Sequence, residues 1–212
     1  MDTKRAQRLL PGALGEALAA VACAPVFSDF QSAKLLGPGG VELTPSVSTV
    51  SASGEDGGHV QDEIGVQVGA GVVDRLDLRA RYVHVEGVNA VGFGPKIGLV
   101  KDRLALAVPV GFAFGEDVEV GKTWAVHPTL LFTQPVVPRL DVNASVKGLI
   151  PLSRDGGDTL VAVNLGLAFG DLERWAIRPE IGFLFNPGES GHFTHLGVGL
   201  TVFAGKKKPS GY

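Results

Sequence analysis

The run from Gly115 to Thr123 is the stretch of this chain that comes nearest to a known chemical motif. It reads GEDVEVGKT and is close to a phosphate-binding loop, in which backbone amides and a lysine hold a polyphosphate. Five residues instead of four separate Gly115 from the Gly-Lys-Thr triplet, and most of the five are acidic and would repel phosphate. A strand pattern, WAVHPTLLF, follows, with no helix N-terminus to receive the phosphate. We therefore expect no nucleotide site and no bound cofactor.

Glu189, Ser190, His192 and His195 form the one group of neighbouring residues of catalytic types. A Ser–His–Glu arrangement needs the base within about 3 Å of the hydroxyl, which residues of one short loop rarely achieve. Two histidines also fall short of the ligands that a closed zinc site requires. We expect solvated loop groups here, and hence no catalytic residue, no metal site and no enzymatic activity.

A third group consists of charged and polar residues at alternating positions within otherwise apolar segments. Both signs are present, so the group could line a selective pore or a ligand site. It could equally fill a narrow interior with paired charges, because an unpaired buried charge is costly. The elements that carry these residues decide between the two roles. The members are Asp77, Arg79, Arg81, Lys96, His127, Asp141, Asn143, Lys147, Asn164, Arg178 and Glu180.

The stretch 64–82, IGVQVGAGVVDRLDLRARY, indicates what these elements are. Side chains of a β-strand alternate between its two faces, and here one face is apolar while the other is small or charged. A soluble antiparallel sheet buries an apolar face and wets a polar one, but a face this rich in glycine is unlike ordinary surface. We predict that the apolar face contacts lipid and that the other face lines a lumen. The lipid-facing residues of the first half are Ile64, Val66, Val68, Ala70 and Val72.

This alternation returns about ten times after Val41, in runs close to the ~9–11 residues of a tilted membrane-spanning strand. Short and long connections largely alternate, as in barrels whose long loops are extracellular, so both ends of the strand series belong at the periplasmic rim. The chain is thus predicted to be all-β, a single antiparallel up-and-down transmembrane β-barrel of about ten strands. The predicted strands are 41–52, 62–73, 76–86, 90–100, 103–114, 123–133, 139–150, 159–169, 175–185 and 193–203.

Aromatic residues gather near both ends of these strands, as in the two interfacial girdles of membrane barrels. The last predicted strand, HLGVGLTVF, ends on Phe203. With these features, residues 40–203 resemble a small bacterial outer-membrane β-barrel protein. The resemblance implies location in the outer membrane, contact with its lipid and assembly by the barrel-assembly machinery.

The N-terminal segment has the order of a secretory signal, with basic residues, an apolar run and then Ala20-Val21-Ala22-Cys23. Its last four residues resemble the lipobox of bacterial lipoproteins, in which the cysteine is acylated. We therefore predict either a signal peptide or a lipoprotein leader at 1–23, in the second case with Cys23 lipidated, and a periplasmic lead-in at 24–39. The barrel is expected at 40–205, and a flexible basic tail at 206–212.

Five prolines fall inside the predicted strands, where each removes a hydrogen-bond donor from the ladder. A closed barrel has no free edge for them, and they favour the alternative of a soluble periplasmic β protein that binds a small ligand. They are Pro45, Pro95, Pro109, Pro128 and Pro179.

Ten strands lie nearer to the side-chain-filled eight-stranded barrels than to the open porins. We therefore expect a structural or weakly pore-forming, porin-like barrel with a charged, largely filled lumen, in which Arg79 and Arg81 meet Glu180 and Asp141. A second alternative is an outer-membrane barrel enzyme with a site among the outer loops. The formal net charge of −3 argues against a nucleic-acid partner.

Processing at Cys23 is directly testable by mass spectrometry of protein extracted from membranes. We expect a mature chain that begins at Cys23 and carries acyl groups. A chain that retains Met1, or that begins at an unmodified Cys23, would show that lipidation does not occur.

Overall fold

The computed structural model describes residues 27–53, 58–115, 118–153, 157–188 and 191–205. Within these ranges no helix has the length and apolar character needed to cross a membrane. The elements are β1 (Val41–Ala52), β2 (His59–Val73), β3 (Leu76–Val85), β4 (Val88–Val100), β5 (Leu104–Ala107), β6 (Val110–Gly115), the 3-10 turn η2 (Val120–Lys122), β7 (Ala125–Val126), β8 (Thr129–Val137), β9 (Leu140–Pro151), β10 (Leu160–Phe169), β11 (Trp175–Phe185) and β12 (Phe193–Ala204).

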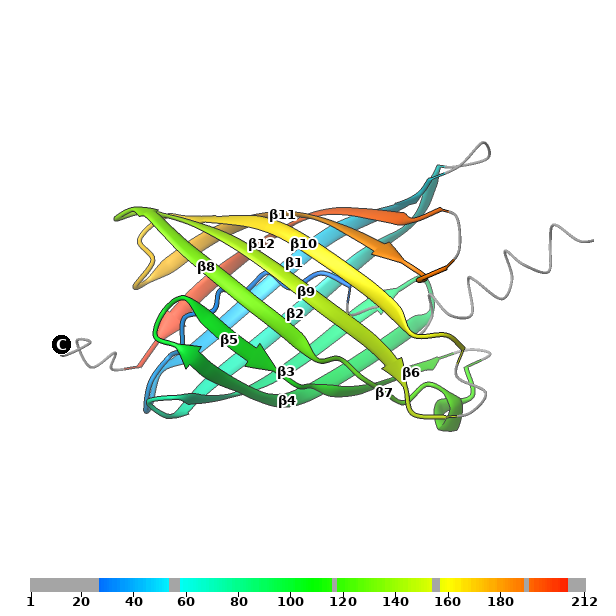
Figure 1. Ribbon diagram of the computed structural model, residues 1–212, viewed down its shortest axis with the longest axis horizontal. Helices are drawn as coiled ribbons and strands as arrows, with labels where there is room; N and C mark the ends of the chain where they lie inside the picture. Colours follow the sequence, from blue (N-terminus) through cyan, green and yellow to red (C-terminus); the bar gives the residue numbers. More distant parts are fainter. Residues whose placement is uncertain (1–26, 54–57, 116–117, 154–156, 189–190, 206–212) are drawn as a thin grey trace, which may run out of the picture.

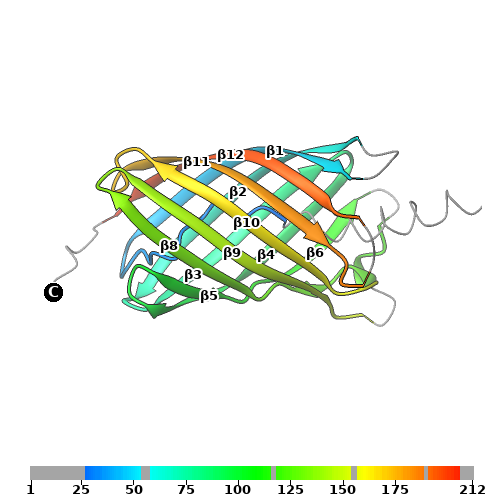
Figure 2. The same cartoon turned by 45° about the horizontal axis from the view of Figure 1, so that its top comes forward.

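The strands close into a single tilted barrel (Figures 1 and 2). β1 pairs antiparallel with β12, from Val41 opposite Ala204 to Ala52 opposite Phe193, and this pairing seals the ring. β5 and β6 both pair with β4, and β7 and β8 both pair with β9, so each of these two pairs is one interrupted strand. The twelve segments therefore make ten strands. The predicted all-β, ten-stranded antiparallel barrel is confirmed.

The wall separates apolar from polar side chains by strand alternation. On the outside, Ile64 is 62% exposed and Phe93 and Leu196 are each 58% exposed, although all three are large and apolar. On the inside of the same wall, Glu63 is only 3% exposed. In a closed ring every strand has two hydrogen-bonded neighbours, so no unpaired edge faces the outside. Such an exterior matches the hydrocarbon core of a bilayer.

The two ends of the barrel differ in their connections. One end, the turn rim, carries the turns 74–75, 101–103, 138–139 and 170–174, the start of β1 and the end of β12. The other end, the loop rim, carries the connections that follow β1, β3, β6, β9 and β11. Its shortest connection is Glu86-Gly87, whose φ angles of 32° and 88° are those of the tight hairpin turns that fit twisted strands.

One predicted connection is wrong. The predicted strands leave residues 134–138 as a loop, but β8 continues to Val137 and only Pro138 and Arg139 separate it from β9. A bulge between Pro135 and Val137 lets these residues stay paired with β9, because an extra residue on one strand absorbs a local mismatch in the ladder.

The five prolines that fall inside the predicted strands occupy positions where the ladder is interrupted. Pro45, Pro95 and Pro179 each have a paired residue on one neighbouring strand. On the other neighbouring strand no residue is paired with them. Pro109 and Pro128 lie in the breaks between β5 and β6 and between β7 and β8. A proline has no backbone N–H to donate, so each lies where the wall lacks a complete ladder. These prolines are therefore compatible with a closed barrel.

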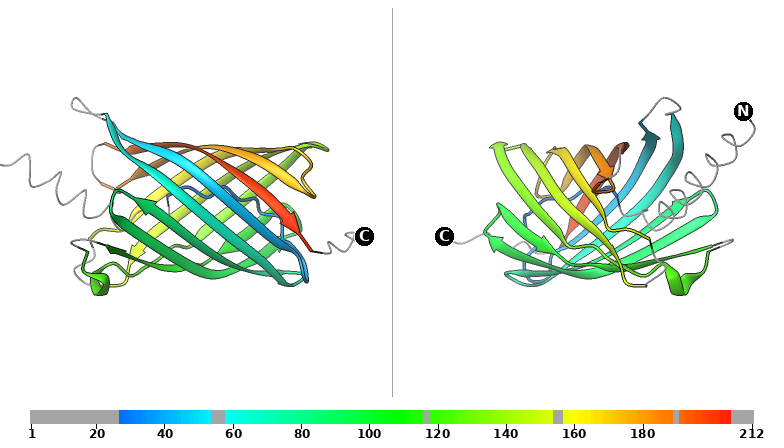
Figure 3. Two further views of the ribbon diagram at one scale, coloured as in Figure 1. Left: turned by 180° about the vertical axis from the view of Figure 1, so that it is seen from behind. Right: turned by 45° about the vertical axis from the view of Figure 1, so that its right-hand side comes forward.

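Residues 27–40 form no strand and run through the inside of the ring (Figures 1 and 3). Near the loop rim, Phe27 packs in an apolar cluster with residues from the ends of four strands: Val50, Leu149, Ala162 and Leu184. At the turn rim, Gly39 donates to the carbonyl of Gly71 at 3.1 Å and Gly71 donates to that of Gly40 at 2.8 Å. The segment thus crosses the lumen from one rim to the other, and we call residues 27–40 the plug.

The plug corrects the expected domain organisation. A periplasmic lead-in at 24–39 is wrong for its described part, because residues 27–39 lie within the barrel. The leader at 1–23 with Cys23, and the tail at 206–212, lie outside the described residues.

The outward wall can be tested with an arginine at Val68, which lies in the middle of β2 and is 41% exposed. If this position faces lipid, Val68→Arg should lower the free energy of unfolding in lipid vesicles by about 2–4 kcal/mol. Gly121→Arg on the loop rim is the control, since nothing lies within 4 Å of a side chain added there. Denaturant titration measures the loss of unfolding free energy for each variant. Equal losses at the two positions would contradict a lipid-facing wall.

Candidate functional site

All eleven predicted lumen residues lie on the inner wall. Arg81 is half-buried, and the other ten are buried. Asp77 and Lys96 are 0% exposed and Lys147 is 1% exposed, so the space around them is filled by other atoms of the protein. The plug provides many of these atoms, and the interior where plug and wall meet is the candidate functional site.

Other inner-wall polar residues were not among the predicted set. They follow the same alternation, so the signal that found Asp77 could also have found them. These buried residues include Glu42, Thr44, Ser48, Gln61, Glu63, Ser145, His195 and Thr201.

The carboxylate of Asp29, in the plug, lies at the centre of the site. Its Oδ1 is 2.8 Å from Nζ of Lys147 on β9. Its Oδ2 accepts hydrogen bonds from Ser145 on β9 and, at 2.7 Å, from Nδ2 of Asn164 on β10. Lys147 and Asn164 also donate to the carbonyl of Phe27, at 3.3 and 3.0 Å. An ion pair this deeply buried is tolerable because further hydrogen bonds satisfy its remaining atoms.

Glu180 on β11 binds the backbone of the same part of the plug. Its two carboxylate oxygens accept the amides of Asp29 and Phe30 at 2.7 and 2.8 Å. On its other side Glu180 faces Nε2 of His195 at 3.1 Å. Two successive amides can point at one carboxylate because Phe30 has a φ of 46°, in the left-handed region that residues other than glycine rarely adopt.

The half of the plug nearer the turn rim is also bound by side chains of the wall. Nζ of Lys96 on β4 donates to the carbonyls of Ser32 and Lys34 at 2.7 and 2.8 Å. Lys34 itself forms an ion pair with Asp141 on β9 at 2.7 Å. Near the turn rim, the amide of Leu36 donates to Asp77 at 3.2 Å. Strands on several sides of the ring therefore bind the plug.

The expected partners of the two central arginines are wrong. Arg79 pairs with Glu42 on β1, which β2 separates from β3 in the wall, and, at 2.9 Å, with Asp77 two residues away on its own strand. Arg81 donates to the carbonyl and the hydroxyl of Ser28 in the plug. Neither guanidinium forms an ion pair with Glu180 or Asp141, although the charge of Glu180 still acts on Arg81.

Inward glycines make room for these groups. A methyl group added at Gly197 would lie 2.7 Å from Cζ of Phe30, and one added at Gly98 would lie 2.9 Å from Cδ1 of Leu35. A methyl group at Gly69 would lie 2.6 Å from a guanidinium nitrogen of Arg79. These separations are shorter than real Cβ contacts, so a side chain at any of these positions would force Phe30, Leu35 or Arg79 to move.

The histidine-containing group from the sequence does not form one site. His195 is 0% exposed inside the barrel, whereas His192 is exposed at the loop rim, with Nδ1 3.1 Å from Oγ of Ser53. The Ser53 hydroxyl donates to the carbonyl of His192 at 2.8 Å and accepts its amide, so it serves to join two loops. Glu189 and Ser190 lie outside the described residues. Among the residues described, no cluster of three or more acidic, histidine or cysteine residues could hold a metal ion.

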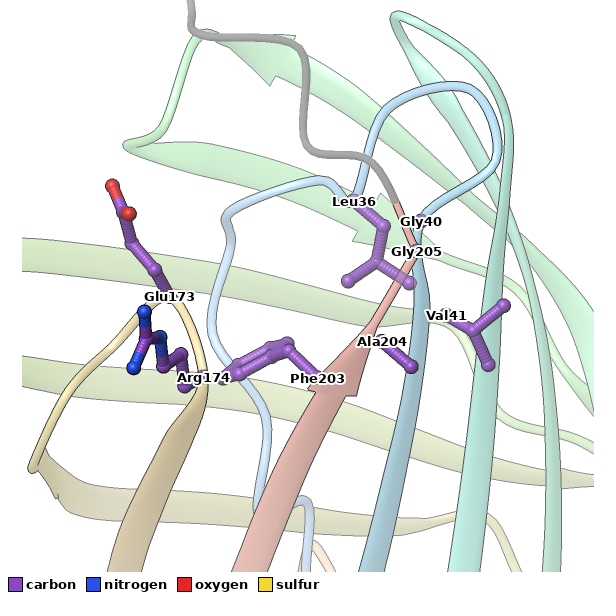
Figure 4. Close-up of a pocket in the computed structure, with 8 residues that line it drawn as sticks. All are labelled: Leu36, Gly40, Val41, Glu173, Arg174, Phe203, Ala204 and Gly205. Carbon is purple, nitrogen blue, oxygen red and sulfur yellow. The ribbon is translucent and has the colours of Figure 1, made fainter.

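A small pocket lies where the plug leaves the lumen at the turn rim (Figure 4). Its volume is about 210 Å³. The plug, the start of β1, the end of β12 and the turn between β10 and β11 contribute its lining, which is Leu36, Gly40, Val41, Glu173, Arg174, Phe203, Ala204 and Gly205. It marks the end of the plug and is separate from the charged interior.

No protein-family model matches the chain, and no curated protein matches it. Several solved structures are similar at 10% sequence identity. They include the translocator domain of autotransporter NalP from Neisseria meningitidis (93% of this chain, 97% of that one, TM-score 0.44). Two others are an outer-membrane channel from Pseudomonas putida F1 (84% and 100%, TM-score 0.45) and the KdgM porin in complex with disordered oligogalacturonate (77% and 98%, TM-score 0.43). The architecture of this chain rests on its own strand pairing.

The ion pair between plug and wall predicts an energetic coupling between Asp29 and Lys147. In a double-mutant cycle of Asp29→Asn and Lys147→Met, the double variant should be more stable than the sum of the single losses predicts, by about 1–3 kcal/mol. Unfolding in lipid vesicles provides the measurement. Lys122→Met is the control, because Lys122 pairs with Glu119 in the loop and should show no coupling to Asp29. Additive losses for Asp29 and Lys147 would contradict the contact.

Proposed function

We propose that this protein is a bacterial outer-membrane barrel with a pore that its own plug closes, and that it conducts solutes when the plug leaves the lumen. It performs no catalysis in this proposal. The observation that carries the proposal is the course of residues 27–40 through the lumen, where wall side chains bind them from the loop rim to the turn rim.

The polar inner wall favours a pore over a purely structural filling. Apolar residues would fill a permanent core at least as favourably, because replacing buried ion pairs by well-packed apolar groups is often neutral or stabilising. The inner wall instead carries charged groups of both signs, such as Lys96, Lys147 and Glu180, together with many amides and hydroxyls. Water can solvate these groups once the plug is gone, which makes the open state accessible.

The ring of strands does not require the plug for its closure. β1 and β12 pair from end to end through backbone contacts of their own, except beside Pro45, and the plug contributes no strand to the sheet. Its contacts with the wall are mainly hydrogen bonds and ion pairs of side chains. Departure of the plug therefore leaves the backbone ladder intact.

The apolar exterior supports location in the outer membrane, where closed barrels of this type occur. The same exterior counts against the alternative of a soluble periplasmic protein, because residues such as Ile64, Phe93 and Leu196 would face water. Assembly by the barrel-assembly machinery and lipidation of Cys23 belong to the proposal on the strength of the sequence alone. The enzyme alternative lacks an observation that favours it.

Conductance in planar bilayers tests the proposed pore. The unmodified protein should be closed for most of the time. Asp29→Lys places a second cation beside Lys147, so it should expel the plug and produce large, steady currents. Glu119→Lys makes the same change of charge in a largely exposed loop residue and should remain closed. If the unmodified protein conducts as freely as Asp29→Lys, or if neither ever conducts, the proposal is wrong.

A further inference from the structure

The wall binds the plug largely through the plug's backbone. Carbonyl oxygens accept hydrogen bonds from wall cations and an amide, and backbone amides donate to wall carboxylates and a hydroxyl. The carbonyls are those of Phe27, Ser28, Ser32 and Lys34, and the amides are those of Asp29, Phe30, Ala33 and Leu36. The inner wall thus has the chemistry that recognises an extended polypeptide.

A few side chains of the plug add specificity to this backbone recognition. The carboxylate of Asp29 meets an ammonium, a hydroxyl and an amide from two strands. The rings of Phe27 and Phe30 both lie edge-on to His195, at centroid distances of 5.0 and 5.8 Å. Lys34 meets Asp141 lower in the lumen.

The site is built around one conformation of the bound segment. Glu180 accepts hydrogen bonds from two successive amides and so keeps Phe30 in the left-handed region. Such a strained backbone conformation persists only where the surrounding structure determines it. Gly197 and Gly199 of β12 leave the space that the ring and Cβ of Phe30 occupy. A lumen that needed only to be filled would not require so specific a fit.

We infer that the lumen is a peptide-binding site for an extended segment of the pattern aromatic-x-Asp-aromatic, which takes the place of the plug when the plug leaves. The inference rests on the proposed function, because a second peptide can enter only where the plug can leave. It goes beyond that function by naming the ligand class. A partner protein that carries such a segment would act on the pore as a peptide ligand.

The plug is covalently joined to the barrel, and this connection determines how well a free peptide can replace it. The plug continues through Gly37-Pro38-Gly39-Gly40 into β1, and a short tether of this kind raises the effective concentration of a bound segment to the millimolar range. A free peptide therefore competes poorly with the native plug. It binds readily once the docking of the plug is weakened.

The test uses the full chain with Asp29→Lys and, as a second variant that adds no charge, Asp29→Ala. The probe is a fluorescein-labelled peptide of residues 27–36, FSDFQSAKLL, added to purified protein in detergent and followed by fluorescence anisotropy. A matched peptide carries Asp29→Asn. Free glutamate in large excess tests for binding of any carboxylate. The same peptides are added to both sides of a planar bilayer that contains the variant.

We expect the native peptide to bind both variants saturably. The Asp29→Asn peptide should bind at least about tenfold more weakly than the native peptide, because hydrogen bonds to a charged group are stronger than those to a neutral one. The unmodified protein should bind the native peptide at least about tenfold more weakly than the variants, since its tethered plug competes. In the bilayer, the native peptide should block the current of Asp29→Lys.

The outcomes separate this inference from the proposed function. If Asp29→Lys conducts and the peptides neither bind nor block, or bind with equal affinity, the peptide site does not exist although the pore does. Displacement by glutamate alone would likewise overturn the inference in favour of a general anion site. If the variants bind the native peptide selectively but never conduct, the peptide site stands and the proposed pore fails.

Discussion

A charge buried inside a barrel must find a partner there, because the outside of the wall is reserved for apolar side chains. Alternation along each strand places Lys96, Lys147 and Glu180 in the interior, where an unpaired charge would be strongly destabilising. A ten-stranded ring is wider than the smallest barrels, whose own side chains fill the lumen. The plug brings backbone carbonyls, amides and Asp29 to these groups. The closed lumen, its buried charges and the left-handed backbone of Phe30 all follow from this pairing.

The architecture was largely readable from the sequence because it depends on a local signal. The period of two in stretches such as 64–73 determines which side chains face outward, and long and short connections identify the two rims. The prolines could not be interpreted in the same way. Pro45 or Pro95 conflicts with a strand only if both sides of the ladder are complete, and the sequence does not reveal which side is interrupted. Only the pairing of neighbouring strands shows that each lies beside a gap.

The site was only half predictable, for a physical reason. Alternation along the strands predicts its wall residues, whereas residues 27–40 show no periodicity and carry few charges. The contacts of the plug span most of the chain, as between Asp29 and Glu180, 151 residues apart. The partners of Arg79 cannot be predicted for a related reason, since the choice between Glu42 and a residue across the lumen depends on strand stagger and on what fills the centre. Neither quantity is encoded in a single strand.

The most direct test of this account is the accessibility of the plug in the folded protein. Cys23 is the one cysteine of the chain, so Cys23→Ser, in protein refolded in detergent and thus independent of processing at that residue, gives a background in which Ser32→Cys is the single thiol. Ser32 is 7% exposed, and the account predicts that a bulky water-soluble maleimide labels this cysteine only after the barrel is unfolded. A cysteine at Gly121 on the loop rim gives the rate for an open position. Labelling of Ser32→Cys at that rate in the folded barrel would contradict a plug within the lumen.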